Sequence, residues 1–225
     1  MPERAVRIIG APRTDEQIAA VARMHVTEVS EGFLSSLGEP VLRLLYRHLA
    51  ASPHSVLILA VSYDDTAGQD APGRAVGYIC GTLDTSALYR EFLRARWPAA
   101  LRVLLPRLLR PRRIRKAVET LRYPAASDAA LPKAEVINFV VVPELRGRGV
   151  ADQLFDQLMQ WFRANGETRV KMVTGERQGR AHGFYEKSGA VLRGRTSLHR
   201  GVPSRVYVYP IGEPIAHPPS QEAPR

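Results

Sequence analysis

Residues 136–162 constrain the fold more than any other part of the chain, because a strand, a turn and a helix follow one another there. Residues 136–142 form an apolar run rich in β-branched residues, with Asn138 as its only polar residue, which predicts a buried strand. From Val150 onward, apolar residues recur at helical spacing until Asn165 and Gly166 supply a stop signal. This order predicts an α/β fold in which the helix packs on a sheet.

The turn between the strand and the helix has the chemistry of an anion-binding site. Gly147 and Gly149 allow a ligand to approach the backbone closely, and Arg146 and Arg148 add positive charge. The start of the helix contributes unpaired amides and the positive end of the helix dipole. The turn is therefore suited to binding phosphate groups.

Two common phosphate-binding motifs do not fit this turn. A Walker A loop ends in Gly-Lys-Ser/Thr, which is missing here. A dinucleotide fingerprint would require glycine at the position of Asp152, and it normally opens a βαβ unit near the start of a fold.

Arg146-x-x-Gly149-x-Ala151 instead resembles the R/Q-x-x-G-x-G/A signature of the GNAT superfamily of acyl-CoA N-acyltransferases. In that family the turn cradles the pyrophosphate of coenzyme A. A second segment, residues 184–190, follows a candidate strand at residues 169–174 and resembles the later aromatic-Tyr-x-x-x-Gly-hydrophobic helix of the family. Two motifs in the family's order imply a GNAT fold, with a mixed central sheet flanked by helices.

The resemblance also implies roles for individual residues. Tyr185 corresponds to the tyrosine that protonates the leaving sulfur, and Glu135 lies where some relatives place a general base, although others use water. The remaining positions implied to bind the cofactor, acetyl-CoA, are Phe139, Val140, Val141, Arg146, Gly147, Arg148, Gly149, Val150, Ala151, Asp152 and Gln178.

The rest of the chain fits one domain over residues 1–211. Strands are expected at residues 5–9, 55–63, 74–83, 191–199 and 204–209, and helices after Thr14 and over residues 40–50. By resemblance, the loop after the first helix lines the acceptor site, which makes Glu28, Ser30 and Glu31 candidates for holding an amine. The alternative is a solvated acidic loop. We expect His182 to have a surface or helix-capping role.

Residues 85–133 form an insertion that the common family pattern lacks. Between residues 90 and 122 we count eleven Arg and Lys residues and two Glu, so this segment holds most of the formal net charge of +10. Leucines recur there at helical spacing, and we expect Pro98, Pro106 and Pro111 to break the segment into short helices. It is interpreted as a flap that packs on the domain or on a second subunit of a homodimer.

The basic insertion has two alternative interpretations. Peripheral membrane contact through residues 94–116 is a further possibility, because basic amphipathic helices bind anionic headgroups. Nucleic-acid binding is not expected, because few aromatic residues accompany the positive charge.

Composition narrows the class of protein. The single cysteine, Cys80, cannot form an internal disulfide and is expected to pack as a small hydrophobe, and no Cys/His cluster suggests a metal. The sequence shows neither a signal peptide nor a long apolar run, which favours a cytoplasmic protein. Residues 212–225 are proline-rich and are predicted to be disordered.

The sequence therefore predicts an N-acetyltransferase that transfers the acetyl group of acetyl-CoA to a primary amine. The positive charge favours a small anionic acceptor, such as a nucleotide-linked amino sugar. The alternatives are a protein or peptide N-acetyltransferase, and a non-catalytic module that binds acetyl-CoA or a membrane surface.

Overall fold

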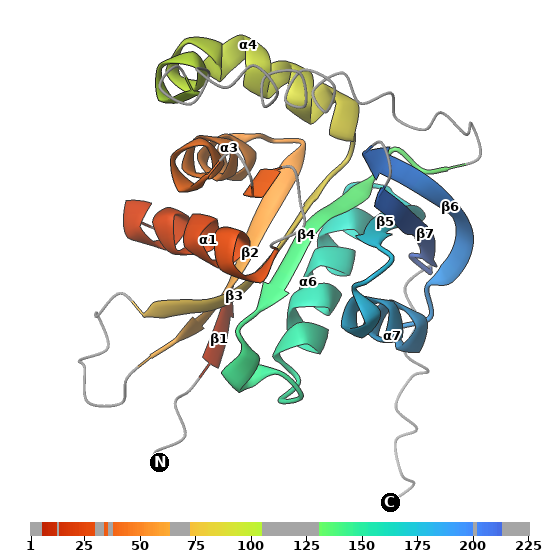
Figure 1. Ribbon diagram of the computed structural model, residues 1–225. Helices are drawn as coiled ribbons and strands as arrows, with labels where there is room; N and C mark the ends of the chain where they lie inside the picture. Colours follow the sequence, from red (N-terminus) through yellow and green to blue (C-terminus); the bar gives the residue numbers. More distant parts are fainter. Residues whose placement is uncertain are drawn as a thin grey trace, which may run out of the picture.

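The computed structural model describes residues 6–12, 14–29, 34–35, 38–63, 73–104, 131–199 and 202–212. These residues build a seven-stranded mixed sheet in the order β1-β2-β3-β4-β5-β7-β6, flanked by helices (Figure 1). Its elements are β1 (Val6–Ile9), α1 (Asp15–Glu28), α3 (Glu39–Ala51), β2 (Ser55–Ser62), β3 (Arg74–Thr82), α4 (Thr85–Leu104), β4 (Glu135–Val141), η2 (Pro143–Leu145), α6 (Val150–Ala164), β5 (Arg169–Gly175), α7 (Gly179–Lys187), β6 (Val191–His199) and β7 (Val202–Pro210).

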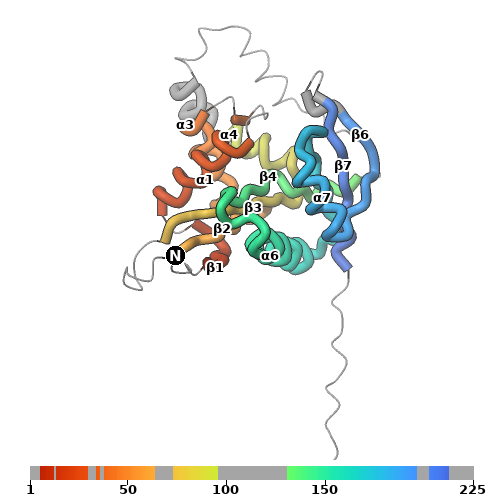
Figure 2. The backbone as a smooth tube through the Cα atoms, turned by 60° about the horizontal axis from the view of Figure 1, so that its bottom comes forward, coloured from red at the N-terminus to blue at the C-terminus, as the bar shows by residue number. Residues whose placement is uncertain are grey.

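The helices divide between the two faces of the sheet (Figures 1 and 2). On one face, α1, α3 and α4 bury a cluster that includes Leu42, Leu49, Leu59 and Tyr78. On the other face, α6 and α7 cover a second cluster, in which Phe162 is fully buried. Each face of the sheet thus has its own apolar core, as expected for an α/β fold. The predicted fold class is confirmed.

The predicted elements lie close to the observed ones. The central strand was expected at residues 136–142 and is found as β4, and the helix expected from Val150 is α6. The predicted cap of the first helix is also confirmed, because the Gln17 amide donates to Thr14 Oγ1 at 3.2 Å.

The expectation that Pro98 breaks the insertion is wrong, because α4 runs through it from Thr85 to Leu104. Proline removes the hydrogen bond to the carbonyl four residues earlier, which belongs here to Arg94. Arg94 is exposed, so water can satisfy that carbonyl and the helix continues. Pro106 and Pro111 lie outside the described residues, as do the rest of the insertion to residue 130 and the tail from residue 213.

The sheet opens between its two central parallel strands. β4 and β5 pair only at Glu135 with Lys171 and at Val136 with Met172. By contrast, β3 pairs with β4 in the antiparallel direction as far as Val141. Beyond Val136, one edge of β4 therefore faces a gap instead of a partner strand.

Helix α6 packs closely on the sheet at Gly81 of β3. A side-chain Cβ at this position would lie 2.7 Å from Cζ of Phe162 and 3.1 Å from Cδ1 of Leu158. Glycine is therefore required here for a steric reason, since interiors are close-packed.

We predict that Gly81→Ala destabilises the protein by about 2 kcal/mol, because overpacking forces α6 away from the sheet. The measurement is urea unfolding followed by circular dichroism. Adding Phe162→Leu should recover part of the loss, because the smaller side chain leaves room for the new methyl group. An unchanged unfolding midpoint in the Gly81→Ala variant would contradict this packing argument.

Candidate active site

The gap between β4 and β5 exposes backbone groups of β4. The Val142 amide donates to the Val76 carbonyl of β3 at 3.0 Å. Successive residues of a strand point their backbone groups to opposite sides. The amides of Val141 and Phe139 therefore face the gap, whereas Val140 pairs with β3 and buries its side chain against α1 and α3.

Aromatic side chains fill the space beneath this gap on the α6 face. Phe139 of β4 meets Phe184 of α7 edge to face, with ring centroids 5.3 Å apart. Phe155 of α6 contacts both Phe184 at 5.5 Å and Tyr209 of β7 at 5.2 Å. The cluster joins β4 to α7 in the region where β4 and β5 no longer pair.

The predicted anion-binding turn lies at the carboxyl end of β4, where the gap is open. Gly147 and Gly149 both have left-handed backbones, with φ of 75° and 76°, and no atom lies within 4 Å of a Cβ added at either. The first helical hydrogen bond of α6 runs from the Gln153 amide to the Gly149 carbonyl. The amides of Val150, Ala151 and Asp152 consequently have no acceptor within the helix.

Arg146 turns its guanidinium away from the start of α6. Its Nε donates to the Val141 carbonyl at 2.9 Å, and its Nη2 forms an ion pair with Glu28 at 2.6 Å. Glu28, which was a candidate for holding an amine, is thus already paired at the end of α1. Ser30 and Glu31 lie outside the described residues.

Two other predicted cofactor-binding residues are exposed near the same end of the sheet. Arg148 lies in the turn, and Gln178 precedes α7, just after β5 ends at Gly175. Because β4 and β5 are parallel, the segments that follow them lie at one edge of the sheet. Both side chains are therefore available at the mouth of the gap.

Tyr185 is buried in α7, with its ring 5.9 Å from those of Phe184 and Tyr207. Burial raises the pKa of its hydroxyl to about 12, and an interaction with the side chain of Thr174 partly opposes this rise. The phenol is therefore protonated at neutral pH.

His182 is buried, so the expected surface role is wrong. Its Nε2 lies 3.1 Å from the Gly175 carbonyl and its Nδ1 lies 3.2 Å from Tyr207 Oη. Tyr207 in turn donates to Glu186 at 2.8 Å. His182 joins the end of β5 to β7 and holds α7 against the sheet.

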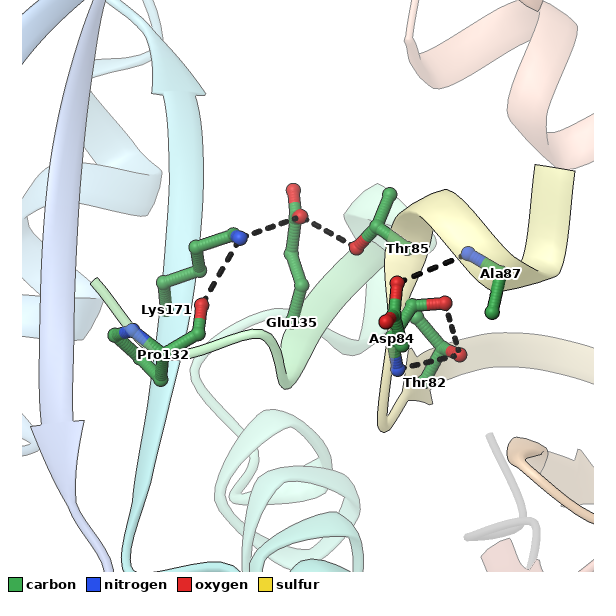
Figure 3. A network of polar contacts seen from close by, with 7 residues as sticks. All are labelled: Thr82, Asp84, Thr85, Ala87, Pro132, Glu135 and Lys171. Carbon is green, nitrogen blue, oxygen red and sulfur yellow. Dashed lines mark hydrogen bonds and ion pairs between the residues drawn. The ribbon is translucent and has the colours of Figure 1, made fainter. Parts of the chain in front are cut away.

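Glu135 lies at the closed end of the gap in a polar network with Thr85 and Lys171 (Figure 3). Its Oε2 accepts a hydrogen bond from Thr85 Oγ1 at 2.6 Å and lies 3.6 Å from Lys171 Nζ. Lys171 also donates to the Pro132 carbonyl at 3.0 Å. Burial raises the pKa of Glu135, while the Lys171 ammonium and the Thr85 hydroxyl act in the opposite direction.

A buried polar chain beside β4 was not predicted from the sequence. It links His25 of α1, Tyr46 of α3, Tyr78 of β3 and Asn138 of β4 by consecutive contacts of 2.6, 2.9 and 3.0 Å. The only signal was Asn138, the one polar residue in an apolar strand. Cys80 beside it is fully buried, and burial raises the pKa of its thiol to about 12, so it packs as an uncharged side chain.

Neither a metal cluster nor a membrane-spanning helix is found in the part of the chain that the structure describes. No group of three or more His, Cys, Asp or Glu side chains could hold a metal ion there. No helix among these residues is long and apolar enough to cross a bilayer.

Comparisons with known proteins agree with this architecture. Residues 18–190 match the sequence model of the acetyltransferase (GNAT) family. A search of curated protein sequences found no match.

Solved structures of acetyltransferases share the fold at low identity. The acetyltransferase of the GNAT family from Streptococcus pneumoniae is 16% identical, with a TM-score of 0.54 over 92% of this chain and 100% of that one. Arabidopsis thaliana NAA60 in complex with acetyl-CoA is 13% identical, with a TM-score of 0.55 over 92% and 99%. The NatC complex bound to Gag peptide and CoA is 15% identical, with a TM-score of 0.56 over 91% and 98%.

We predict that Lys171→Met destabilises the protein by about 3 kcal/mol at pH 8, because it leaves the Glu135 carboxylate buried without its counter-charge. The deficit should shrink toward pH 5, since a raised pKa lets the folded protein protonate Glu135 as the pH falls. Urea unfolding at both pH values measures this. The Glu135→Gln/Lys171→Met double variant should recover most of the loss, and an equal deficit at the two pH values would refute the pairing.

Proposed function

Because this chain belongs to the GNAT family of acetyltransferases, we propose that it transfers the acetyl group of acetyl-CoA to the nitrogen of a primary amine. As a family member it is an acetyl-CoA-dependent acyltransferase. The observation that carries the proposal is the uncrowded turn before α6 at the open end of the gap between β4 and β5.

The cofactor is proposed to lie across this end of the sheet. The free amides of Val150, Ala151 and Asp152 would bind the pyrophosphate, because helix starts attract anions. The pantetheine arm would then run along β4 and replace the strand partner that β5 no longer supplies. The amides of Phe139 and Val141 face that path and are suited to hold the arm and to polarise the thioester carbonyl.

Tyr185 is the proposed general acid. The amine attacks the thioester carbon, and the tetrahedral intermediate then collapses with cleavage of the carbon–sulfur bond. The departing thiolate takes its proton from the phenol of Tyr185. The raised pKa of this phenol keeps its proton in place at neutral pH.

Glu135 is the proposed general base. Both of its contacts with described residues fall on Oε2, so Oε1 is available to a water molecule. Through that water the carboxylate would take the proton of the incoming ammonium. Burial raises the pKa of Glu135 and makes the carboxylate a stronger base than an exposed one.

The proposed acceptor is a primary amine. A small anionic acceptor, such as a nucleotide-linked amino sugar, is favoured by the basic segment 94–116, which begins within α4. A peptide is the second candidate, because a structure with the same fold holds a Gag peptide and CoA. Contact of this segment with a membrane surface, formation of a homodimer and a cytoplasmic location stay predictions.

We predict that Gly149→Ala weakens acetyl-CoA binding about tenfold in calorimetry, because alanine is strained at a left-handed φ and distorts the turn. Gly166→Ala is the matched control, since Gly166 has a φ of 80° at the other end of α6. Both variants should lose about 1 kcal/mol of stability, whereas only Gly149→Ala should lose affinity. Equal affinities of the two variants would remove the turn from the cofactor site.

We predict that Tyr185→Phe lowers kcat about 100-fold at saturating acceptor while the Kd of acetyl-CoA stays the same, because only proton donation is lost. Release of free thiol measures the turnover. Tyr209→Phe is the control, as it removes a hydroxyl from a tyrosine of the neighbouring aromatic cluster that packs on Phe155 of α6. Wild-type kcat in the Tyr185→Phe variant would exclude this residue as the acid.

A further inference from the structure

The buried polar chain from α1 to β4 has a defined direction. Each phenol carries one proton, and Tyr78 gives its proton to Asn138 Oδ1. Tyr46 must then donate to Tyr78, and His25 Nδ1 must donate to Tyr46. Burial lowers the pKa of His25 to about 4, so the ring is neutral and holds its one proton on Nδ1. All the donors point toward β4.

This direction fixes the carboxamide of Asn138. Its Oδ1 is held by Tyr78, and Cys80 Sγ lies 3.7 Å from its backbone carbonyl. The residue is only half-buried, and its Nδ2 makes no hydrogen bond to any described residue. That nitrogen is also not among the described polar atoms that are sealed from solvent without a partner. It is therefore an oriented donor that is open to a ligand.

Asn138 and Glu135 present open polar atoms on the same face of β4. In the register with β3, Glu135 lies opposite Thr82 and Asn138 opposite Cys80, with a bulge between them. The intervening Gly81 faces α6, so Thr82 and Cys80 share the other face of the sheet. Glu135 and Asn138 consequently lie on the face covered by α1, α3 and α4. Both Oε1 of Glu135 and Nδ2 of Asn138 are free of contacts with described residues.

We propose that Asn138 determines acceptor specificity by donating from Nδ2 to an oxygen that lies next to the reacting amine. The acceptor class is then an amine with an adjacent carbonyl or carboxylate, as in an amino acid or a peptide N-terminus. This inference rests on the proposed function and reverses the order of its two candidate acceptors. Asn138 lies on β4 close to the proposed base Glu135, whereas the amino sugar is argued only from the charge of segment 94–116.

The two open atoms complement such an acceptor. Carboxylate oxygen attracts the ammonium through water, and the carboxamide N–H₂ group donates to the neighbouring oxygen. Because of the bulge, Glu135 and Asn138 lie opposite residues that are two positions apart on β3, so about 7 Å of sheet separates them. An amine with its adjacent oxygen can bridge this distance, with a water beside Glu135. Tyr78 occupies one acceptor position of Asn138 Oδ1 and orients the carboxamide, so that Nδ2 presents its N–H groups to the acceptor. Polyamines and simple alkyl amines lack the oxygen that the site would bind.

The decisive test compares Asn138→Asp with the wild-type protein on two small acceptors, glycinamide and ethylamine. Aspartate still accepts the hydrogen bond from Tyr78 but offers an oxygen where Nδ2 was. It should lower kcat/KM for glycinamide about tenfold more than for ethylamine, mainly through KM. A short peptide and glucosamine are run alongside: the peptide should lose activity as glycinamide does, and the wild-type protein should use both of these better than glucosamine, whose oxygens next to the amine are hydroxyls and not carbonyls.

A second variant tests the same idea without adding charge. Tyr78→Phe releases Oδ1, so the carboxamide can rotate, and the preference for glycinamide over ethylamine should fall in the same direction. The Kd of acetyl-CoA, measured by calorimetry, should not change in either variant, because the side chains of Asn138 and Tyr78 meet on the face of the sheet covered by α1 and α3, whereas the cofactor is proposed to bind main-chain groups at the edge of β4.

Equal losses for glycinamide and ethylamine in both variants would overturn the role of Asn138 and leave the proposed function intact. A wild-type preference for glucosamine over the peptide and glycinamide would overturn the acceptor class. Failure of the wild-type protein to bind acetyl-CoA or to release thiol with any amine would instead count against the proposed function, and with it this inference.

Discussion

Two backbone pairs hold the parallel strands β4 and β5 together, and the separation of the strands beyond those pairs underlies the rest of the site. A sheet that stayed paired would leave no unsatisfied edge on β4. Because the strands diverge, the amides of Phe139 and Val141 face a gap in which no described strand supplies a partner. The pantetheine arm has amide groups of its own, and we propose that it pairs with this edge. The divergence of β4 and β5 thus costs the sheet backbone pairs and at the same time exposes an edge of β4 for binding.

The separation must be held at a fixed width for this edge to bind anything. At the closed end, the ion pair of Glu135 with Lys171 joins β4 to β5 directly. Below the gap, the aromatic cluster around Phe184 connects β4, α6, α7 and β7. At the open end, Arg146 ties the carbonyl of Val141 to Glu28 at the end of α1. Three kinds of contact thus stabilise an opening that backbone pairing would otherwise close.

Local patterns in the sequence predicted the central part of the fold well. The apolar run, the two glycines and the helical spacing are contiguous, so β4, the turn and α6 could be identified without any knowledge of the partners. The chain from His25 to Asn138 could not, because its contacts join residues 21, 32 and 60 positions apart. His182 and Arg146 were interpreted from their sequence neighbours, whereas their partners come from other strands and helices. Pro98 was judged by local propensity alone, which packing and solvation can override.

The central claim is that main-chain donors of β4 and of the α6 start bind acetyl-CoA. Amide hydrogen exchange with and without acetyl-CoA, resolved to single residues by NMR, tests it most directly. We predict slower exchange on acetyl-CoA binding at five amides, those of Phe139, Val141, Val150, Ala151 and Asp152. Little change is expected at Val140, which already pairs with β3. Protection confined to other parts of the chain, with these amides unaffected at saturating acetyl-CoA, would contradict it.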